Sequence, residues 1–419
     1  MTSALSSFGH LVSCDDYEAA AAKVLASAAP GTLTYFSSGA GDEITLERNR
    51  LCFRDWALLP RVLIDVSSVS TSTTILGRVV SQPFGIAPSA FQRLLHPDGE
   101  LGMARAAIAC NIPHCLSSSA TTSLEDVAAE ARGRGLRFMQ VNFQHHFRVL
   151  FLSPFSSLLC ELFLQIYTHV NRSVTKLLVE RAESCGYAAI VITVDRPVLG
   201  KRDNVARSGF TISWSSHGDP NRLGNASNAS ALYDDTITAS LTWDDVAWFK
   251  SITKLPIVLK GIMSPVDAAR AAHAGAAAVW ISNHGGRQLD SAVTALDVLP
   301  ACVAAVREVE AARSDIGSKR VEVWVDGGFR RGTDVIVALA LGADFVFLGR
   351  PPLWGLTVGG EAGVKALLSG LGDEVRTAMQ LLGTVAVKEI SSDFVVRRGP
   401  LMALQSHDIA KIVALTPRL

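Results

Sequence analysis

The chain has 419 residues, of which 48% are hydrophobic and 19% charged, and its formal net charge is zero. Such values are typical of a globular protein with a large core, and zero net charge gives no electrostatic reason to expect nucleic acid or an anionic membrane as partner. The seven cysteines show no metal-ligand spacing, so the sequence predicts neither a metal site nor a disulfide framework. The N-terminus lacks the basic and apolar segments of a secretory signal, and we expect a soluble intracellular enzyme.

In chain order, an N-terminal helical segment over 1–80 is expected to pack on a barrel domain over 81–400, followed by a C-terminal tail over 401–419. Within the barrel domain, short apolar runs alternate with Ala- and Leu-rich segments of helical pattern. The runs are 84–88, 114–118, 137–140, 188–194, 256–260, 277–282, 321–326 and 344–349. Their continuous apolar character is typical of parallel strands buried on both faces. The sequence therefore predicts an α/β fold, a (β/α)₈ TIM barrel, with a doubly wound open sheet as the alternative.

Every apolar run ends in a polar residue. These residues are Ser89, Ser117, Gln140, Thr193 with Asp195, Lys260, Ser282 with Asn283 and His284, Asp326 and Arg350. Since barrel enzymes place their active sites at the carboxyl ends of the strands, we expect an active site there. The long polar segment between Thr193 and Pro256 is expected to form a lid loop over that site.

Two segments carry specific chemistry. The Asp-Gly-Gly turn at 326–328 and the Gly349-Arg350 pair follow the seventh and eighth runs, where barrels bind phosphate through backbone N–H groups and an arginine. His284 lies just past the sixth run, three residues before Arg287, and suits a general base beside a carboxylate-binding arginine. The alternatives are glycines that only end strands and a purely structural histidine.

Five segments together closely resemble the FMN-dependent 2-hydroxy acid oxidase and dehydrogenase family, which includes glycolate oxidase, lactate oxidase and flavocytochrome b2. They are "YFSSGAGDEITLERN" (35–49), "IAPSAFQRLLHPDGE" (86–100), "TVDRPVLGKRD" (193–203), "SNHGGRQ" (282–288) and "GFRRGTDVIVALALGADFVFLGRP" (328–351). The resemblance runs from about residue 15 to the C-terminus, with 141–165 as the one interruption.

The resemblance implies a role for each matching residue. His284 would be the catalytic base, oriented by Asp195, and the substrate would be bound by Tyr35, Tyr167, Arg202 and Arg287. The isoalloxazine ring of FMN would be bound by Pro88, Ser89, Ser117, Gln165, Thr193 and Lys260. The ribityl chain and phosphate would be bound by Ser282, Asp326, Gly328, Arg330, Gly349 and Arg350.

The implied reaction is oxidation of an L-2-hydroxy acid to the 2-oxo acid, with O₂ as acceptor and H₂O₂ as product. Two alternatives stay open: a dehydrogenase of the same fold that passes electrons to a quinone or cytochrome, and an inactive relic of an FMN barrel. The residues do not distinguish hydride transfer from a carbanion mechanism. The resemblance also implies a homo-oligomer, a tetramer, and the final Pro-Arg-Leu is a weak peroxisomal address, so the expected location is cytoplasmic or peroxisomal.

The chain departs from the family at Ser119, in "LSSSATTS", where glycolate oxidases have a sequence resembling "LSSWATSS". Loss of a tryptophan should enlarge the pocket, so we expect a substrate larger than glycolate, such as a compound of a biosynthetic pathway, unless neighbouring side chains fill the space.

The second departure is the Phe-rich stretch 141–165. Pro154 and the charges of Arg148 and Glu161 argue against a membrane span. Deleting the stretch restores the family pattern, its first codon can supply GT and its last CAG, and we predict a spurious insertion from a retained intron. If it is translated, Gln165 in "LFLQ" can replace Gln140 in "RFMQ".

Overall fold

The computed structural model describes residues 10–131, 137–141, 163–166, 172–211, 239–312 and 320–398, with the backbone alone described over 137–141 and 163–166. The predicted lid lies partly, and the C-terminal tail wholly, outside these ranges. The division into segments 1–80, 81–400 and 401–419 stays a prediction.

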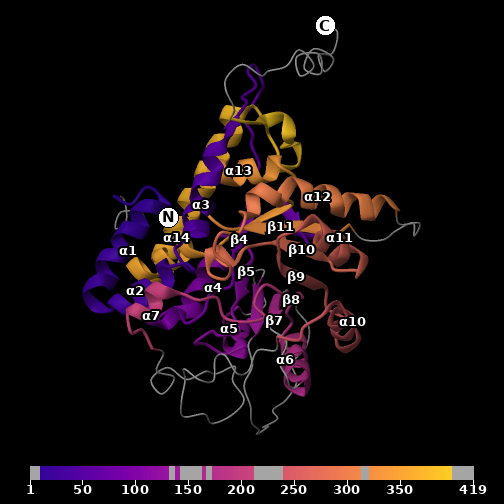
Figure 1. Cartoon of the computed structure of the whole chain (residues 1–419). Coiled ribbons are helices and arrows are strands. Elements are labelled where there is room, and N and C mark those ends of the chain that lie inside the picture. Colours follow the sequence, from indigo (N-terminus) through magenta and orange to yellow (C-terminus); the bar gives the residue numbers. More distant parts are fainter. Residues whose placement is uncertain are drawn as a thin grey trace.

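Parallel strands close into a barrel at the centre of the molecule (Figure 1). Each strand pairs with the next in chain order, and the last, β12, pairs with the first, β4. The strands are β4 (Phe84–Ile86), β5 (His114–Leu116), β6 (Arg137–Val141), β7 (Phe163–Ile166), β8 (Ala189–Thr193), β9 (Ile257–Ile262), β10 (Ala278–Ile281), β11 (Glu322–Asp326) and β12 (Phe345–Leu348). The predicted α/β barrel is confirmed.

The strand count departs from the prediction. Each of the eight predicted runs contains a strand, and β7 is an additional one, so the described residues form nine strands instead of eight. Gln140 of β6 and Gln165 of β7 are partners in a parallel ladder. The two runs "RFMQ" and "LFLQ" share one pattern of apolar and polar residues, so both can pair as strands of the barrel. Gln165 therefore lies beside Gln140 and does not replace it.

Helices surround the barrel and connect its strands (Figure 1). They are α4 (Gly99–Ala109), α5 (Leu124–Glu130), α6 (Arg172–Ser184), α7 (Asp203–Arg207), α10 (Trp243–Ile252), α11 (Pro265–His273), α12 (Ala295–Ala312), α13 (Gly332–Ala340) and α14 (Arg350–Leu382). Serine side chains cap α5 and α11 by accepting hydrogen bonds from backbone N–H groups of the first turn. None of the described helices is long and apolar enough to cross a membrane.

The chain before the barrel contributes α1 (Cys14–Ala28), α2 (Pro30–Ser37), α3 (Ile44–Leu51) and the strand β1 (Trp56–Leu58), which pairs with β13 (Val395–Arg397). Short 3₁₀ helices complete the fold at Cys52–Asp55, Gln92–Leu94, His284–Gly286, Val387–Glu389 and Ser392–Phe394. Helix α1 packs against α14.

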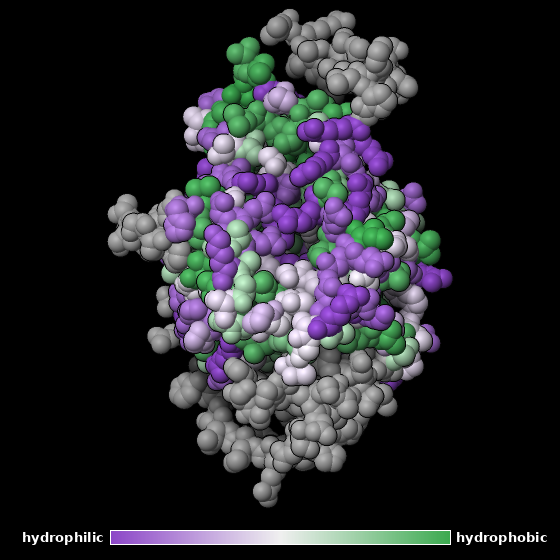
Figure 2. Space-filling view, turned by 60° about the vertical axis from the view of Figure 1, so that its left-hand side comes forward, coloured by the Kyte–Doolittle hydropathy of each residue, from purple (hydrophilic) through white to green (hydrophobic). Residues whose placement is uncertain are grey.

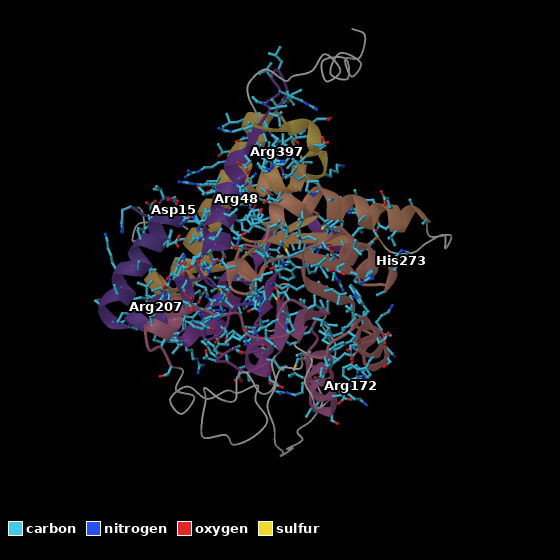
Figure 3. All side chains as sticks on the ribbon, in the orientation of Figure 1. Asp15, Arg48, Arg172, Arg207, His273 and Arg397 are labelled. Atoms are coloured by element: carbon cyan, nitrogen blue, oxygen red, sulfur yellow. The ribbon has the colours of Figure 1, made fainter. Side chains whose placement is uncertain are left out.

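Aromatic side chains fill the barrel interior. Trp280, Trp324 and Phe347 are fully buried, with ring centroids 4.0 Å apart for Trp280 and Phe347 and 5.6 Å apart for the two tryptophans. Polar side chains such as those of Arg172, Arg207 and His273 lie at the periphery (Figure 3). In Figure 2, hydrophilic side chains extend across the middle of the face, and hydrophobic ones form smaller groups between them.

A hairpin closes the N-terminal end of the barrel. Its strands β2 (Thr73–Ile75) and β3 (Arg78–Val80) place Ile75 and Val80 in the same apolar cluster as the two tryptophans. The N–H of Leu76 donates to Oε1 of Glu322 at 2.7 Å, and Nε1 of Trp324 donates to Oε2 at 2.8 Å. Burial raises the pKa of Glu322 to about 7, although these hydrogen bonds act to lower it.

Candidate active site

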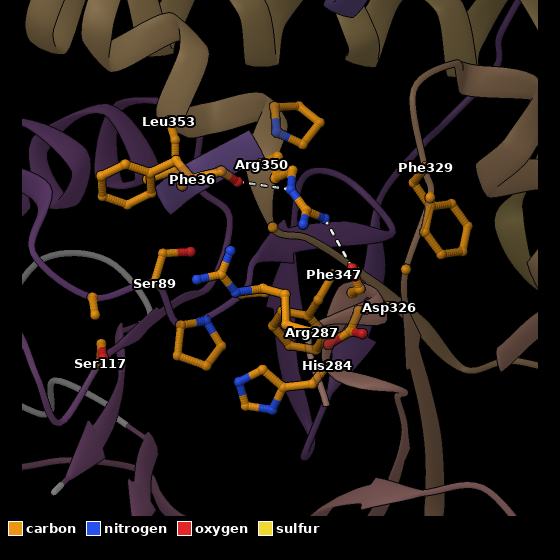
Figure 4. A pocket seen from close by; sticks show the side chains of 18 of the residues that line it. Phe36, Ser89, Ser117, His284, Arg287, Asp326, Phe329, Phe347, Arg350 and Leu353 are labelled. Carbon is orange, nitrogen blue, oxygen red and sulfur yellow. Dashed lines mark hydrogen bonds between the residues drawn. The ribbon is translucent and has the colours of Figure 1, made fainter. Parts of the chain in front are cut away.

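A cavity of about 1000 Å³, its open mouth included, lies at the carboxyl ends of the strands. Most of the predicted site residues line it, and Figure 4 shows them converging from several strand ends. They are Tyr35, Pro88, Ser89, Ser117, Arg202, Lys260, His284, Arg287, Asp326, Gly328, Arg330, Gly349 and Arg350.

The other predicted residues do not line the cavity in the described structure. Asp195 is hydrogen-bonded to the lining residue His284, and Ser282 to the lining residue Lys260. Thr193 lies opposite Lys260 in the β8–β9 ladder, and its buried Oγ1 has no hydrogen-bond partner among the described residues. Only the backbone of Gln165 is described, and Tyr167 lies outside the described residues.

His284 and Asp195 form the central pair. Nδ1 of His284 lies 3.0 Å from Oδ1 and 3.1 Å from Oδ2 of Asp195. His284 follows β10 at a positive φ of 59°, a conformation held by the hydrogen bond from its N–H to Oγ of Ser282 at 3.1 Å. On the other side, a Cβ at position 261 would lie 2.5 Å from Cβ of Asp195, so Gly261 lets the carboxylate approach.

The electrostatics of this pair leave the histidine neutral and the aspartate charged. Burial lowers the pKa of His284, and the positive charges of Lys260 and Arg202 lower it further, against the opposing effect of Asp195. Burial alone would raise the pKa of Asp195, but His284, Lys260 and Arg196 together outweigh burial, and that pKa is lowered. A neutral imidazole whose Nδ1–H donates to a carboxylate keeps its lone pair on Nε2, as a general base requires.

Arg287 is held at the end of α2, and Arg202 is held on Arg287. Nη1 of Arg287 donates to the carbonyls of Tyr35 at 2.6 Å and Ser38 at 3.1 Å, and its Cζ lies 4.9 Å from the Tyr35 ring centroid. The last carbonyls of a helix lack partners within the helix, so these bonds satisfy them and fix the guanidinium. Arg202 donates through Nε to the carbonyl of Arg287 at 3.2 Å, which places the two arginines side by side.

A buried polar triad lies deeper in the cavity. Nζ of Lys260 donates to Oγ of Ser282 at 3.0 Å and lies 3.4 Å from Oδ2 of Asp326. Oγ of Ser282 in turn donates to Oδ1 of Asp326 at 2.6 Å. The side chains of Lys260 and Asp326 are only 5% and 8% exposed, so each charge depends on the other.

Arg350 and Arg330 form a cationic end of the cavity. Arg350 donates to the carbonyls of Phe36 at 2.9 Å and Gly285 at 3.0 Å (Figure 4), and also to the carbonyl of Ser38 at 3.0 Å. A guanidinium has five N–H groups, so two remain for a ligand. Burial lowers the pKa of Arg350 to about 9, and the nearby charges of Arg287 and Arg330 add to this effect. A bound anion would relieve that repulsion.

The N-terminal helices belong to the same site. Asn49 of α3 and Asn283 exchange side-chain hydrogen bonds of 3.0 and 2.8 Å. Asp290 accepts from the backbone N–H groups of Asp42 and Thr45, each at 2.9 Å. At Gly328, with φ of +87°, a Cβ would lie 1.7 Å from the carbonyl oxygen of Asn49, so only glycine fits.

Several residues that line the cavity were not predicted from the sequence. Phe36, Phe329, Phe347 and Leu353 supply apolar walls, and none of them carries a reactive group that a motif would single out. Arg196 also lines the cavity and is only 4% exposed. The sequence feature that could have identified Arg196 is its position directly after Asp195, at the polar end of a predicted strand.

These residues fit the FMN that the resemblance implies. Arg350 and Arg330 suit a phosphate, and the buried hydroxyl of Thr193 beside Lys260 suits the polar edge of a flavin. The same cavity is lined by His284, so the groups that suit the cofactor and the candidate base face one space.

Comparisons with known proteins agree with this fit. The family model described as FMN-dependent dehydrogenase matches residues 25–150 and 156–397. The chain is 42% identical to an L-lactate oxidase from Nostoc sp. over 374 residues, which are 86% of this chain and 92% of that protein. It is 39% identical to human 2-hydroxyacid oxidase 1 over 93% of this chain and 98% of that protein. A solved structure of mandelate oxidase matches with a TM-score of 0.76 and 36% identity, over 90% of this chain and 96% of that one.

Proposed function

The chain belongs to the family of FMN-dependent dehydrogenases, and from this membership we propose that it oxidises an L-2-hydroxy acid to the 2-oxo acid. In the reaction the Cα–H and O–H bonds of the substrate break and a C=O bond forms. The two electrons and two protons that leave the substrate reduce O₂ to H₂O₂. The observation that carries the proposal is the His284–Asp195 pair at the edge of a cavity lined by arginines.

FMN, when bound, supplies the acceptor for the two electrons and passes them to oxygen. Around its ring we place Lys260 and Thr193, with Pro88, Ser89, Ser117 and Gln165. Around its ribityl chain and phosphate we place Arg350 and Arg330, with Ser282, Asp326, Gly328 and Gly349.

His284 accepts the proton at Nε2, because Nδ1 is held by Asp195. As the imidazole becomes positively charged, the buried carboxylate 3.0 Å away stabilises that charge. Asp195 thus has two effects: it fixes the tautomer before the proton moves and offsets the charge afterwards.

Arg287 and Arg202 bind the substrate carboxylate. The carbonyls of α2 use some of the N–H donors of Arg287 and leave others for the ligand. Two fixed cations hold the carboxylate in one orientation, which brings the substrate Cα–H and hydroxyl to His284. Tyr35 and Tyr167 are proposed to bond the remaining substrate oxygens.

The substrate is proposed to be larger than glycolate. The proposal rests on Ser119, which lines the cavity and has a much shorter side chain than the tryptophan that the resemblance to glycolate oxidases leads us to expect there. A mandelate oxidase among the similar solved structures agrees with a larger substrate.

The acceptor is proposed to be O₂ because the relatives that the chain matches over nearly its whole length are named as oxidases. A homo-oligomer, a tetramer, and a cytoplasmic or peroxisomal location are also proposed from the family. One of the matched relatives is a peroxisomal (S)-2-hydroxy-acid oxidase from Oryza sativa.

The test is to mix the purified yellow protein anaerobically with a panel of (S)-2-hydroxy acids and follow the flavin absorbance. Bleaching by one or more of them, followed by H₂O₂ formation when air is admitted, is the expected result. Bleaching with electron transfer only to dyes would indicate the dehydrogenase alternative. A protein that binds FMN and is bleached by no member of the panel would contradict the proposed function and indicate the inactive relic.

A further inference from the structure

Gln288, the last residue of the segment "SNHGGRQ" (282–288), joins two loops of the active site. Its side chain is half-buried and does not line the cavity in the described structure. It extends instead from the loop after β10, to which it belongs, to the loop after β8. A side chain between two loops of a site can set their relative position without touching a ligand.

Each of these two loops supplies one member of both functional pairs. The loop after β8 carries Asp195 and Arg202, and the loop after β10 carries His284 and Arg287. The candidate base and its carboxylate therefore meet across the two loops, at 3.0 Å. The two arginines also meet across them, through the bond from Nε of Arg202 to the carbonyl of Arg287 at 3.2 Å. A shift of one loop against the other would change both pairs at once.

The amide of Gln288 binds the facing loop at three points. Its Nε2 donates to the carbonyls of Asp195 at 3.1 Å and Val198 at 3.0 Å. Its Oε1 accepts from the N–H of Gly200 at 3.2 Å. Both the donor and the acceptor of the amide are used, which no apolar side chain of the same length can reproduce. The backbone of Asp195 is thus fixed directly by Gln288.

Gly200 lets the two loops come close enough for these bonds. A Cβ at position 200 would lie 2.5 Å from the carbonyl oxygen of Gln288 and 2.6 Å from that of Arg287. Backbone atoms cannot be approached so closely, so an alanine at this position would push the loops apart. The contact between the loops therefore depends on two separate features, an amide on one loop and the lack of a side chain on the other.

We propose, on the basis of the function proposed above, that Gln288 is a positioning residue for the oxidation of the 2-hydroxy acid. It holds the loop after β8 in the position at which Asp195 orients His284. The same position places Arg202 beside Arg287 for the substrate carboxylate. Proton transfer and carboxylate binding then both depend on one amide outside the cavity.

Other bonds limit how far the loops can separate. The N–H of Ala40 donates to the carbonyl of Gly286 at 2.8 Å, and the N–H of Gly41 donates to the carbonyl of Lys201 at 3.0 Å. The chain between α2 and α3 thus binds both loops independently of Gln288. A variant at Gln288 is therefore expected to fold, with the loops displaced.

The first experiment measures flavin reduction in the holoenzyme with the 2-hydroxy acid that bleaches it fastest. Gln288→Met keeps the length of the side chain and removes all three bonds. It should slow flavin reduction roughly 10- to 100-fold, because a displacement of about 1 Å has an effect of this order on positioned groups. Gln380→Met is the matched control, since Gln380 is an exposed residue of α14 that donates to the carbonyl of Val66. It should leave the rate unchanged.

The second experiment measures binding without turnover. Titration calorimetry of the oxidised holoenzyme with the 2-oxo acid product reports the arginine pair. Gln288→Met should weaken this binding about 3- to 10-fold, as expected when a charged hydrogen bond is weakened and not lost. Gln380→Met should bind the product as the original protein does.

The pH profile distinguishes positioning from a general loss of stability. Burial lowers the pKa of His284, Asp195 raises it, and the charges of Lys260 and Arg202 lower it. Among these charged groups Asp195 has the largest influence, so its displacement should lower the pKa of His284 further. The acid limb of kcat/KM should therefore move to lower pH in Gln288→Met. Loss of stability alone would reduce the amount of active enzyme and leave the limb in place.

Gly200→Ala tests the same contact from the other loop. It should also slow flavin reduction and move the acid limb to lower pH. In the double variant the two effects should be less than additive, because both substitutions separate the same loops. If Gln288→Met does not fold, Gly200→Ala alone carries the test.

Three results would overturn the inference. The first is flavin reduction within about threefold of the original rate in Gln288→Met. The second is an acid limb that stays in place in the variants, and the third is full additivity of the two substitutions. In each of these cases the original protein is still bleached by a 2-hydroxy acid, whereas failure of the proposed function means that no such acid bleaches it.

Discussion

The two ends of the barrel are formed by the same strands but tolerate buried charge in different ways. At the carboxyl end, Lys260, Arg287 and Arg350 are held by hydrogen bonds that leave donors directed at a cavity. At the amino end, the hairpin β2–β3 fills the opening, and the buried carboxyl of Glu322 has its pKa raised to about 7. The carboxyl end therefore holds fixed charges that can bind ligands. At the amino end, protonation of Glu322 lowers the free-energy cost of burying its carboxyl group.

The largest contrast is expected in catalysis. His284→Gln removes the base and should lower the rate of flavin reduction roughly 10²- to 10⁴-fold. Glu322→Gln, at the other end of the barrel, should leave that rate within about twofold. Stopped-flow bleaching of the flavin measures both, and a comparable loss in Glu322→Gln would mean that the two ends are not functionally separate.

Cofactor affinity should also depend on the carboxyl end. Arg350→Met removes a charged donor from the proposed phosphate site and should weaken FMN binding roughly 10- to 150-fold. Arg331→Met is the control, because that side chain is 49% exposed and pairs with Glu374. Fluorescence titration of each apoprotein with FMN gives the Kd values of the two variants. Equal Kd values for Arg350→Met and Arg331→Met would show that Arg350 does not bind the phosphate.

The pH dependence of kcat/KM should report the neutral His284. Protonation removes the base, so the rate should fall about tenfold for each pH unit below the pKa of His284. Because burial lowers this pKa, the fall should begin below the ordinary value of about 6.5. Asp195 acts to raise it, so Asp195→Asn should move the acid limb to still lower pH and reduce the plateau. A limb centred above 6.5 would contradict this assignment.

The smallest effect is expected in stability at the amino end. The raised pKa of Glu322 means that the folded protein binds more protons than the unfolded chain between about pH 4.5 and 7. Stability should therefore fall as pH rises through this window, by roughly 1–2 kcal/mol after allowance for partial exposure. Glu322→Gln should abolish that part of the pH dependence. Thermal melts of both proteins at pH 5 and 7.5 test this. If the difference in stability between the two pH values is the same in Glu322→Gln as in the original protein, Glu322 is not its cause.

The sequence predicted the parts of the fold that depend on pattern. Continuous apolar runs identified the strands, and polar residues at their ends identified the face with the cavity. The ninth strand was not predicted, because the backbone pairing of β7 beside β6 depends on neighbours that no single run shows. Arg196 and Glu322 were missed because their burial results from packing by other elements, not from the residues next to them.

The origin of the stretch 141–165 stays a proposal. We propose that it is a spurious insertion from an intron retained in the gene model and is absent from the protein, and the family match is interrupted at 151–155, inside it. Transcript sequences that omit the stretch are the expected result. A tryptic peptide lying wholly within 149–172 would establish that the protein contains it.

The hydrogen bonds that Arg287 and Arg350 make to the end of α2 have a consequence for the order of events during synthesis. Tyr35, Phe36 and Ser38 leave the ribosome early, yet the groups that bond their carbonyls, on Arg287 and Arg350, follow 249 to 314 residues later. Loop closure over such separations is slow compared with local folding. A nascent chain can form individual βα units, but the cavity is complete only when Leu353 has emerged. We therefore expect flavin to be acquired by a nearly finished polypeptide, and any early termination of translation to yield a colourless product.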